Sequence, residues 1–328
     1  MRAFERKLIT EWRRLDLPAG DATIIIAVSG GADSLSLLLA VNELSKLGKL
    51  DNRVVAAHFN HHLRGEESDA DENFVRDICM ERKIEFAAGH SHIKHISNIE
   101  QAARIERYDF LLKTAENVRA WSVMTAHTVD DQAETFLLNL IRGSGIQGLS
   151  GIRPDRLLST DHQIKLIRPM LSWARRLETE GYCHELGIKY RSDTMNEDET
   201  FSRVRIRKVL LPMLRDFNPK ITERLADTAR LLSEEIGPKP EAAGDSLKIA
   251  DLKEFSDAEM GRLLRAWLAV NRGDNRQIEL KHIDAVRRLV NSRKSGKTVE
   301  LPGGSTVVKH GGKLIFSNNL VEKKGSGN

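Results

Sequence analysis

The stretch that decides the fold is Ile24-Ile25-Ile26-Ala27-Val28-Ser29-Gly30-Gly31-Ala32-Asp33-Ser34, followed by an apolar run over 35–41. Its order predicts a buried strand, a tight glycine turn and a helix that opens on Asp33 and Ser34. Adjacent glycines let backbone N–H groups approach a ligand closely, and a helix N-terminus favours an anion. An ordinary strand-to-helix turn is the alternative, but it needs only one glycine. The surrounding hydroxyls and carboxylate favour a phosphate site with its metal ion.

The stretch does not match the common nucleotide-binding loops. A Walker A loop requires a lysine after its last glycine, and no lysine lies between Asp21 and Lys46. The dinucleotide-binding pattern requires a third glycine, which is absent here. The Ser-Gly-Gly-x-Asp-Ser form resembles the loop of the N-type ATP pyrophosphatases, the PP-loop enzymes. That resemblance implies cleavage of ATP between the α and β phosphates, which leaves adenylate on a substrate oxygen.

Apolar runs and helical patterns alternate up to about residue 190. Further buried strands are predicted at 54–57 and 122–126, and helices at 69–82, 99–116 and 129–141. The alternation predicts an α/β fold with a parallel sheet and helices on both faces. Ligands of such sheets bind outside the carboxyl ends of the strands, so the segments that leave each strand are the candidate site segments.

The first candidate segment is His58-Phe59-Asn60-His61-His62-Leu63-Arg64. Its histidines do not suit a metal site, because adjacent side chains cannot all point at one ion and no cysteine assists. A nucleotide contact is the better interpretation. We expect His58, Asn60 and His61 to supply polar groups and Arg64 to face the phosphates.

The second candidate segment is the helix predicted at 99–116. Arg104 and Tyr108 share one face at i, i+4 spacing, and Arg107 lies one turn beyond the small Ala103. An arginine that points into a phosphate site clamps developing charge. A surface helix with ordinary ion pairs is an equally good interpretation of the same residues.

The third candidate segment is His127-Thr128-Val129-Asp130-Asp131-Gln132-Ala133-Glu134, with Arg142-Gly143-Ser144-Gly145 after it. Asp130, Asp131 and Glu134 place more negative charge in the first helical turns than capping requires. Their carboxylates could hold Mg²⁺ or an ammonium group. The four-residue spacing brings His127 and Asp131 together if the helix begins by Thr128.

Composition bounds the setting of the protein. A chain of 328 residues is long enough for two domains, and Cys79 and Cys183 are too few for a disulfide framework. The charged N-terminus lacks a signal-peptide core, and no apolar run approaches membrane-spanning length. We therefore expect a cytoplasmic protein with no membrane partner.

Charge is unevenly distributed along the chain. Residues 1–200 carry 26 Lys and Arg against 31 Asp and Glu, whereas residues 201–328 carry 25 against 16. A basic C-terminal part favours a polyanionic partner such as nucleic acid, although a lysine-rich solvated surface is the common alternative. Composition further divides the chain into a catalytic domain at 1–215, a helical linker at 216–245 and a small basic α+β domain at 246–328. A homodimer is one open oligomeric state.

Together the motifs resemble those of the bacterial tRNA(Ile)-lysidine synthetases. The matching elements follow in order over the first 215 residues: the 29–34 loop, His58-x-Asn60-His61-x-Leu63-Arg64, Ala103-Arg104-x-x-Arg107-Tyr108, the 127–135 block with Arg142-Gly143-Ser144-Gly145, Arg168-Pro169, Asp193-x-x-Asn196 and Arg203-x-Arg205-Ile206-Arg207. A weaker match is Gly296-Lys297-x-x-x-Leu301-Pro302-Gly303-Gly304. Val204 departs from the pattern, since members commonly carry asparagine there. Longer members have a further C-terminal domain, so a short form and a truncated chain are both open.

The resemblance implies a two-step ligation that uses ATP and Mg²⁺. Adenylation of the C2 oxygen of the wobble cytidine, in a tRNA(Ile) with a CAU anticodon, turns a poor leaving group into a good one. The ε-amine of free L-lysine then displaces AMP at C2. A PP-loop tRNA thiolase, or another adenylating tRNA-modifying enzyme, is the alternative, and a non-catalytic RNA-binding protein is a third possibility.

Residue roles follow from places in the motifs. The resemblance assigns catalysis to Asp33, Arg107, His127, Asp131 and Arg205, with Asp33 also at the metal. It assigns ATP binding to Ser29, Gly30, Gly31, Ala32, Asp33, Ser34, His58, Asn60 and Arg64. It assigns lysine and tRNA binding to Asp131, Glu134, Arg203 and Arg207.

Overall fold

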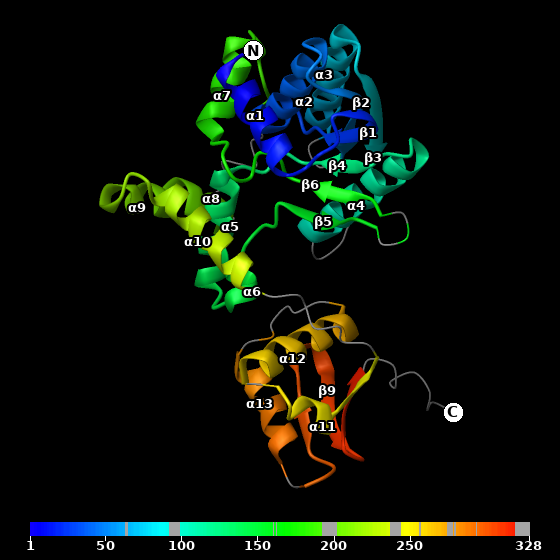
Figure 1. The fold of residues 1–328 in the computed structure, drawn as a ribbon, viewed down its shortest axis with the longest axis vertical. Coiled ribbons are helices and arrows are strands. Elements are labelled where there is room, and N and C mark those ends of the chain that lie inside the picture. The colour runs from blue at the N-terminus through cyan, green and yellow to red at the C-terminus, as the bar shows by residue number, and fades with distance from the viewer. Residues whose placement is uncertain are drawn as a thin grey trace. The chain divides into compact units, whose positions relative to one another are not determined.

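The computed structural model describes residues 1–62, 65–91, 99–159, 161, 163–191, 202–236, 244–255, 257–273, 278, 280–292 and 294–318. The chain forms two compact units (Figure 1). One comprises Met1–Ile141 and Gly148–Ser233, and the other comprises Arg142–Gln147 and Glu234–Asn328. The finer division at 215 and 245, with a separate linker, stays a prediction.

The larger unit is built on a six-stranded sheet in the order β3-β2-β1-β4-β6-β5. Its strands are β1 (Gly20–Ala27), β2 (Asp51–Asn60), β3 (Glu85–His90), β4 (Ser122–Met124), β5 (Asp155–Leu157) and β6 (Lys165–Ile167). All neighbours are parallel except β5 and β6, whose short connection allows only an antiparallel pair. The predicted parallel sheet is therefore confirmed, with one antiparallel strand at its edge.

Both faces of this sheet are covered by helices, because the central strand is apolar on both sides (Figure 1). On one face lie α1 (Ala3–Arg14), α2 (Ala32–Lys46), α3 (Glu66–Arg82) and α7 (Arg176–Glu185), around a core that includes Trp12 and Tyr182. On the other face lies α4 (Ile99–Asn117), whose Leu111 packs against Ile25 and Val123. Helix α2 begins at Ala32 with Gly31 as its N-cap, one residue before the predicted start.

A smaller helical cluster follows the sheet. Helix α5 (Val129–Ile141) has the predicted bounds and packs on a π-helical turn, Ile206–Leu210, between α8 (Ser202–Arg205) and α9 (Leu211–Phe217). Helix α10 (Ile221–Glu235) is the helix expected before the second domain. Ala133 and Leu137 from α5 share this core with Ile206 and Leu211.

The second unit is a small α+β domain, as predicted. Its four-stranded antiparallel sheet has the order β7-β10-β9-β8. The strands are β7 (Ser246–Lys248), β8 (Thr298–Glu300), β9 (Ser305–His310) and β10 (Lys313–Asn318), and the helices are α11 (Ile249–Leu252), α12 (Asp257–Arg272) and α13 (Leu280–Asn291). Trp267 and Val286 are fully buried in its core. A short helix, α6 (Ile146–Leu149), lies in the remaining connection after α5.

Candidate functional site

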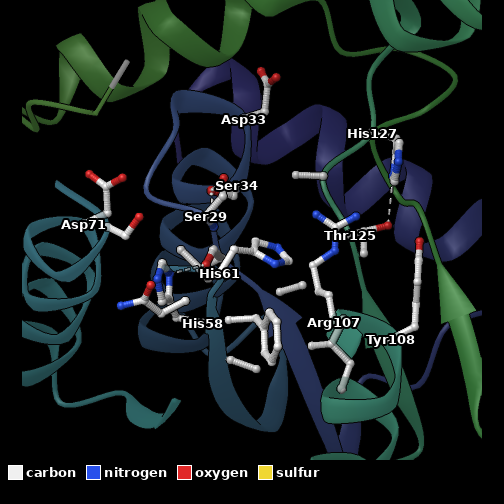
Figure 2. Close-up of a pocket in the computed structure, with 18 of the residues that line it drawn as sticks. Ser29, Asp33, Ser34, His58, His61, Asp71, Arg107, Tyr108, Thr125 and His127 are labelled. Carbon is white, nitrogen blue, oxygen red and sulfur yellow. Dashed lines mark hydrogen bonds between the residues drawn. The ribbon is translucent and has the colours of Figure 1, made fainter. Parts of the chain in front are cut away.

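A cavity of about 410 Å³ opens where β1, β2 and β4 end. This is the edge at which a parallel sheet binds ligands. Figure 2 shows Ser29 and Ser34 on one side of the cavity and Arg107, Thr125 and His127 on the other. The polar residues of its lining are Ser29, Asp33, Ser34, His58, Asn60, His61, Ser68, Asp71, Arg107, Tyr108, Thr125, His127 and Asp131.

The loop between β1 and α2 is stabilised by hydrogen bonds to the hydroxyl group of its own Ser34. Ser34 Oγ accepts a hydrogen bond from Ser29 N at 3.1 Å and donates to Gly31 O at 3.0 Å. Gly30 has φ +89°, a conformation that side-chain-bearing residues rarely adopt. Because no side chain caps α2, its first N–H groups remain available to an anion.

Only part of the predicted Ser29–Ser34 loop lines the cavity. Ser29, Asp33 and Ser34 are among the lining residues, whereas Gly30, Gly31 and Ala32 are not, within the described part of the chain. Gly30 O instead accepts a hydrogen bond from Arg191 N at 3.0 Å. The backbone of the turn is thus braced from outside while its hydroxyls face the ligand space.

Asp33 is the acidic residue in the first turn of α2, directly after this loop. Thr179 Oγ1 donates a hydrogen bond to it, and Arg176 Nε lies 3.7 Å from its Oδ2 atom. Burial raises the pKa of Asp33 to about 6, against the opposing effects of Thr179 and Arg176, and the nearby charge of Asp131 adds to the rise. The carboxylate is therefore short of positive charge.

Asp33 fits a magnesium site shared with a nucleotide. Mg²⁺ in such sites takes one or two carboxylates and completes its shell with substrate phosphates and water. Over the described residues, no group of three or more His, Cys, Asp or Glu is placed to hold a metal by itself. An under-neutralised carboxylate beside an anion-binding loop suits an ion that arrives with the nucleotide.

Arg107 and His127 line the same side of the cavity (Figure 2). Burial lowers the pKa of Arg107, but the guanidinium remains protonated at neutral pH. Burial, followed by the charges of Arg168 and Arg107, lowers the pKa of His127 to about 3. Its Nδ1 atom lies 3.0 Å from Thr125 Oγ1. His127 is therefore a neutral imidazole, which can donate a hydrogen bond to an anion but adds no positive charge.

The segment that leaves β2 contributes neutral polar groups. Burial lowers the pKa of His58, whose Nδ1 atom lies 2.9 Å from Val28 O. Burial and the charge of Arg107 lower the pKa of His61 to about 4, and its buried Nδ1 has no hydrogen-bond partner. Asn60 donates to Asp69 at 2.8 Å. Arg64 lies outside the described residues.

Asp131 caps the helix that carries it. Its Oδ2 atom accepts hydrogen bonds from Thr128 N at 2.8 Å and Thr128 Oγ1 at 3.0 Å. Asp131 N in turn donates to Thr128 Oγ1 at 3.4 Å, which completes the reciprocal pattern of a capping box. Its Oδ1 atom lies 3.4 Å from Arg176 Nη2. One oxygen is thus fixed by the backbone, and the other faces a cation.

The other two carboxylates of this turn are occupied by arginines. Asp130 accepts from Arg175 Nε at 3.0 Å and from Arg176 N at 2.8 Å. The fully buried Glu134 accepts from Arg207 Nε at 2.7 Å and from Arg176 Nη1 at 3.3 Å. This explains the excess acidity of the segment: its carboxylates neutralise guanidinium groups from later helices.

The predicted arginine triplet divides between two faces. Arg203 donates to Thr135 Oγ1 at 2.7 Å and Arg207 pairs with Glu134, so both face α5. Arg205 is exposed. None of the three lines the cavity in the described chain.

Several lining or supporting residues have no role predicted from the sequence. Thr125 lies near the end of the strand predicted at 122–126, and Tyr108 lies on the predicted helix face that it shares with Arg104. Arg176 and Thr179 carry no such local signal, because only the packing of α7 on α2 brings them to Asp33. Asp71 reaches the cavity from α3 and pairs with Arg191.

Models of two known families match this chain. A family model of the PP-loop domain matches residues 4–214, and a model of the TilS substrate binding domain matches residues 247–315. A curated tRNA(Ile)-lysidine synthase of Chlorobaculum tepidum is 32% identical over 335 residues, covering 96% of this chain and 97% of the relative. One of Geobacter sulfurreducens is 33% identical over 321 residues, covering 91% of this chain.

The relatives differ in length. This chain spans 66% of the Geobacter sulfurreducens protein and 64% of the Dehalococcoides mccartyi tRNA(Ile)-lysidine synthase. Among solved structures, the U34-tRNA thiolase NcsA from Methanococcus maripaludis has a TM-score of 0.59 and 18% identity, covering 74% of this chain and 82% of the thiolase. That likeness concerns the fold alone.

Proposed function

Because the chain belongs to the tRNA(Ile)-lysidine synthase family of PP-loop enzymes, we propose that it ligates L-lysine to C2 of the wobble cytidine of tRNA(Ile). The reaction consumes ATP, passes through an adenylated tRNA and releases AMP and pyrophosphate. It changes both the codon that the tRNA reads and its amino-acid identity. The observation that carries this proposal is the single cavity shared by the Ser29–Ser34 loop, Arg107, His127 and Asp131.

The phosphate end of ATP is assigned to the loop. Free N–H groups at the start of α2 and the Ser29 and Ser34 hydroxyls would bind the leaving pyrophosphate. Asp33 would hold Mg²⁺, which supplies charge neutralisation across the phosphates. The raised pKa of Asp33 supports this role, because a cation would relieve the cost of its buried charge.

The centre of reaction is assigned to the opposite wall. Arg107 would stabilise the charge that develops on the α-phosphate as the cytidine oxygen attacks. His127, neutral because of burial and the surrounding arginines, would donate a hydrogen bond to the same phosphate. His58, Asn60 and Arg64 would contact the remainder of the nucleotide.

Lysine recognition is assigned to the acidic turn of α5. Asp131 Oδ1 is not used by the cap and has Arg176 Nη2 at 3.4 Å, so it would bind the lysine ammonium group beside that guanidinium. Glu134, buried between Arg176 and Arg207, would act by holding those arginines in place. The exposed Arg205, with Arg203 and Arg207 beside it, would contact the tRNA and its adenylated base.

The cysteines support ligation over sulfur transfer. A thiolase generally needs reactive cysteines near the nucleotide, whereas Cys79 and Cys183 are buried and line no part of the cavity in the described chain. Burial raises the pKa of both thiols to about 12, so they are not nucleophiles at neutral pH.

The deciding experiment measures AMP release and lysine incorporation with a CAU-anticodon tRNA(Ile). We expect adenylation to require the tRNA, and AMP release with a stable product to require lysine. Asp131→Asn keeps a capping oxygen but removes the charge, so it should reduce lysine use by at least about tenfold while adenylation continues. Arg107→Ala should lose adenylation, and the distant surface variant Arg53→Gln should lose neither. Turnover that ignores lysine would overturn the proposal.

A further inference from the structure

Tyr108 stands at the centre of a group of arginines. The guanidinium carbons of Arg104, Arg156 and Arg107 lie 5.0, 5.2 and 5.7 Å from the centroid of its ring. Arg104 and Arg107 come from α4, whereas Arg156 comes from β5, at the edge of the sheet. Two elements far apart in the sequence therefore bring like charges to one aromatic ring.

A fourth arginine, Arg168, belongs to this group, because its charge acts to lower the pKa of Tyr108. It is only 4% exposed, and it donates from Nη1 to Arg153 O at 2.7 Å. Its buried Nε atom has no hydrogen-bond partner. A buried guanidinium with an unpartnered N–H is costly unless an anion completes its shell. We name Arg104, Arg107, Arg156, Arg168 and Tyr108 the Tyr108 arginine cluster.

The cluster has no acidic counterpart in the described part of the chain. None of its four arginines forms an ion pair with a described carboxylate, whereas Arg175, Arg176 and Arg207 near α5 are paired in this way. Stacking on one aromatic ring offsets only part of the repulsion between four cations. Such an arrangement is the usual preparation for a phosphate ligand.

The placement of the cluster distinguishes a long ligand from a mononucleotide. Arg107 and Tyr108 line the cavity, but Arg104 and Arg156 are exposed and do not. The charges therefore run from the cavity wall outward along the sheet edge. A nucleotide held by the Ser29–Ser34 loop would use the inner end alone, whereas a polyanion that enters the cavity from outside would use the whole row.

We propose that the Tyr108 arginine cluster binds the phosphodiester backbone of the RNA strand beside the target cytidine, and so positions that base over the nucleotide. The proposal rests on the proposed function for the identity of the RNA. Its chemistry, phosphate bound by guanidinium, is shared with ATP, so the experiment must separate the two sources. Arg107 acts at both, Arg104 and Arg156 act on the RNA, and the buried Arg168 adds positive charge next to Tyr108.

The test compares RNA and ATP affinities in Arg104→Gln, Arg156→Gln and the control Arg53→Gln. Arg53 is exposed on the same sheet, paired with Glu85, and near the opposite ends of the strands. We expect each cluster variant to bind tRNA(Ile) about five- to tenfold more weakly and to lower the slope of log Kd against log salt by about one. ATP affinity, measured by calorimetry, should stay within about twofold, and the control should change neither quantity.

A chemical probe addresses the RNA side directly. Wild-type protein should bind less tightly when one phosphate next to the target cytidine is replaced by an uncharged methylphosphonate. The same replacement should have little further effect in the cluster variant that has lost its partner. Thermal unfolding of each variant establishes that it is folded, which is expected because both substituted side chains are exposed.

Three results would overturn the inference. One is a loss of ATP affinity that equals the loss of RNA affinity, which would assign the cluster to the nucleotide. The second is unchanged RNA affinity and salt slope in both variants. The third is a methylphosphonate effect that persists in every variant. If the wild-type protein incorporated no lysine while the cluster variants lost RNA affinity as expected, the proposed function would be overturned but the RNA-binding role of the cluster would remain.

Discussion

Arg176 Nε lies 3.7 Å from Asp33 Oδ2, and this pair joins α7 to the first turn of α2 beside the phosphate loop. The same guanidinium reaches Asp131 at 3.4 Å and Glu134 at 3.3 Å. Its neighbours raise the pKa of Arg176 despite burial, so its charge is permanent. One side chain thus balances three carboxylates at the candidate site.

Arg176→Gln should destabilise the protein strongly. The substitution leaves Asp33, Asp131 and Glu134 short of countercharge in a mostly buried setting, and breaking such a group costs about 3 kcal/mol or more. Arg53→Gln breaks an exposed pair with Glu85, which solvent screens, and should change the stability little. Urea unfolding at pH 7.5 measures both. Equal losses in the two variants would show that the network contributes no more than a surface pair.

Asp33→Asn should stabilise the metal-free protein at alkaline pH. The pKa of Asp33 is raised to about 6 in the folded state, so the folded state binds more protons than the unfolded chain between roughly pH 4 and 6. Stability attributable to this group is therefore lost as pH rises through that window. At pH 8 in EDTA, the free energy of unfolding of the variant should exceed that of wild type by about 3 kcal/mol, and near pH 4 the difference should vanish.

The same Asp33→Asn protein should fail to turn over Mg-ATP. Stabilisation together with loss of activity would mark Asp33 as a charge kept for a ligand. A variant that is less stable than wild type at pH 8 would show that the ionised carboxylate is favourable in the fold, contrary to its raised pKa.

Gly30→Ala should weaken ATP binding and stability together. Gly30 has φ +89°, and a Cβ there would lie 3.5 Å from Val75 Cγ2, so the cost is mainly backbone strain of about 1–2 kcal/mol. Gly181→Ala is the matched control, since Gly181 lies inside α7 with open space around it. That change should stabilise by about 0.5–1 kcal/mol. Calorimetric ATP binding that is unaltered in Gly30→Ala would contradict the assigned loop.

Tyr108 should be the first tyrosine to ionise. Burial acts to raise its pKa, but Arg104, Arg107, Arg168 and Arg156 together outweigh burial and hold the pKa below its usual value. Burial raises the pKa of Tyr182 and Tyr190, the other tyrosines of the chain. Phenolate absorbance should therefore show an early phase that Tyr108→Phe removes. Binding of RNA should move this phase to higher pH, because phosphate neutralises the arginines.

Much of this fold could be predicted from local pattern. The bounds of α5 and the glycine turn before α2 follow from short apolar runs and turn residues, and both were predicted closely. The β5–β6 pair could not be predicted, since strands of three residues carry no clear periodicity. Helix α2 begins one residue early because a glycine, and not a side chain, occupies its N-cap.

The candidate site likewise combines residues that local sequence predicts with residues that it does not. Ser29, Asp33, His58, Arg107 and His127 lie at strand ends or on predicted helices, and all of them line one cavity. Arg176, Thr179 and Arg156 reach the site through tertiary packing, which leaves no trace in neighbouring residues. The acidic residues at 130–134 predict a site for Mg²⁺ or an ammonium group. In the structure, Asp130 and Glu134 accept hydrogen bonds from arginines that lie 42 to 73 positions further along the chain.

Arg176 and Arg207 converge on a single atom, Oε1 of Glu134. Removing either arginine lets the carboxylate shift toward the other, so the effects of the two substitutions on folding will not be additive. One oxygen atom thereby connects three helical elements that are far apart in the sequence. A substitution at any of the three positions during evolution therefore limits which residues the other two positions can accept.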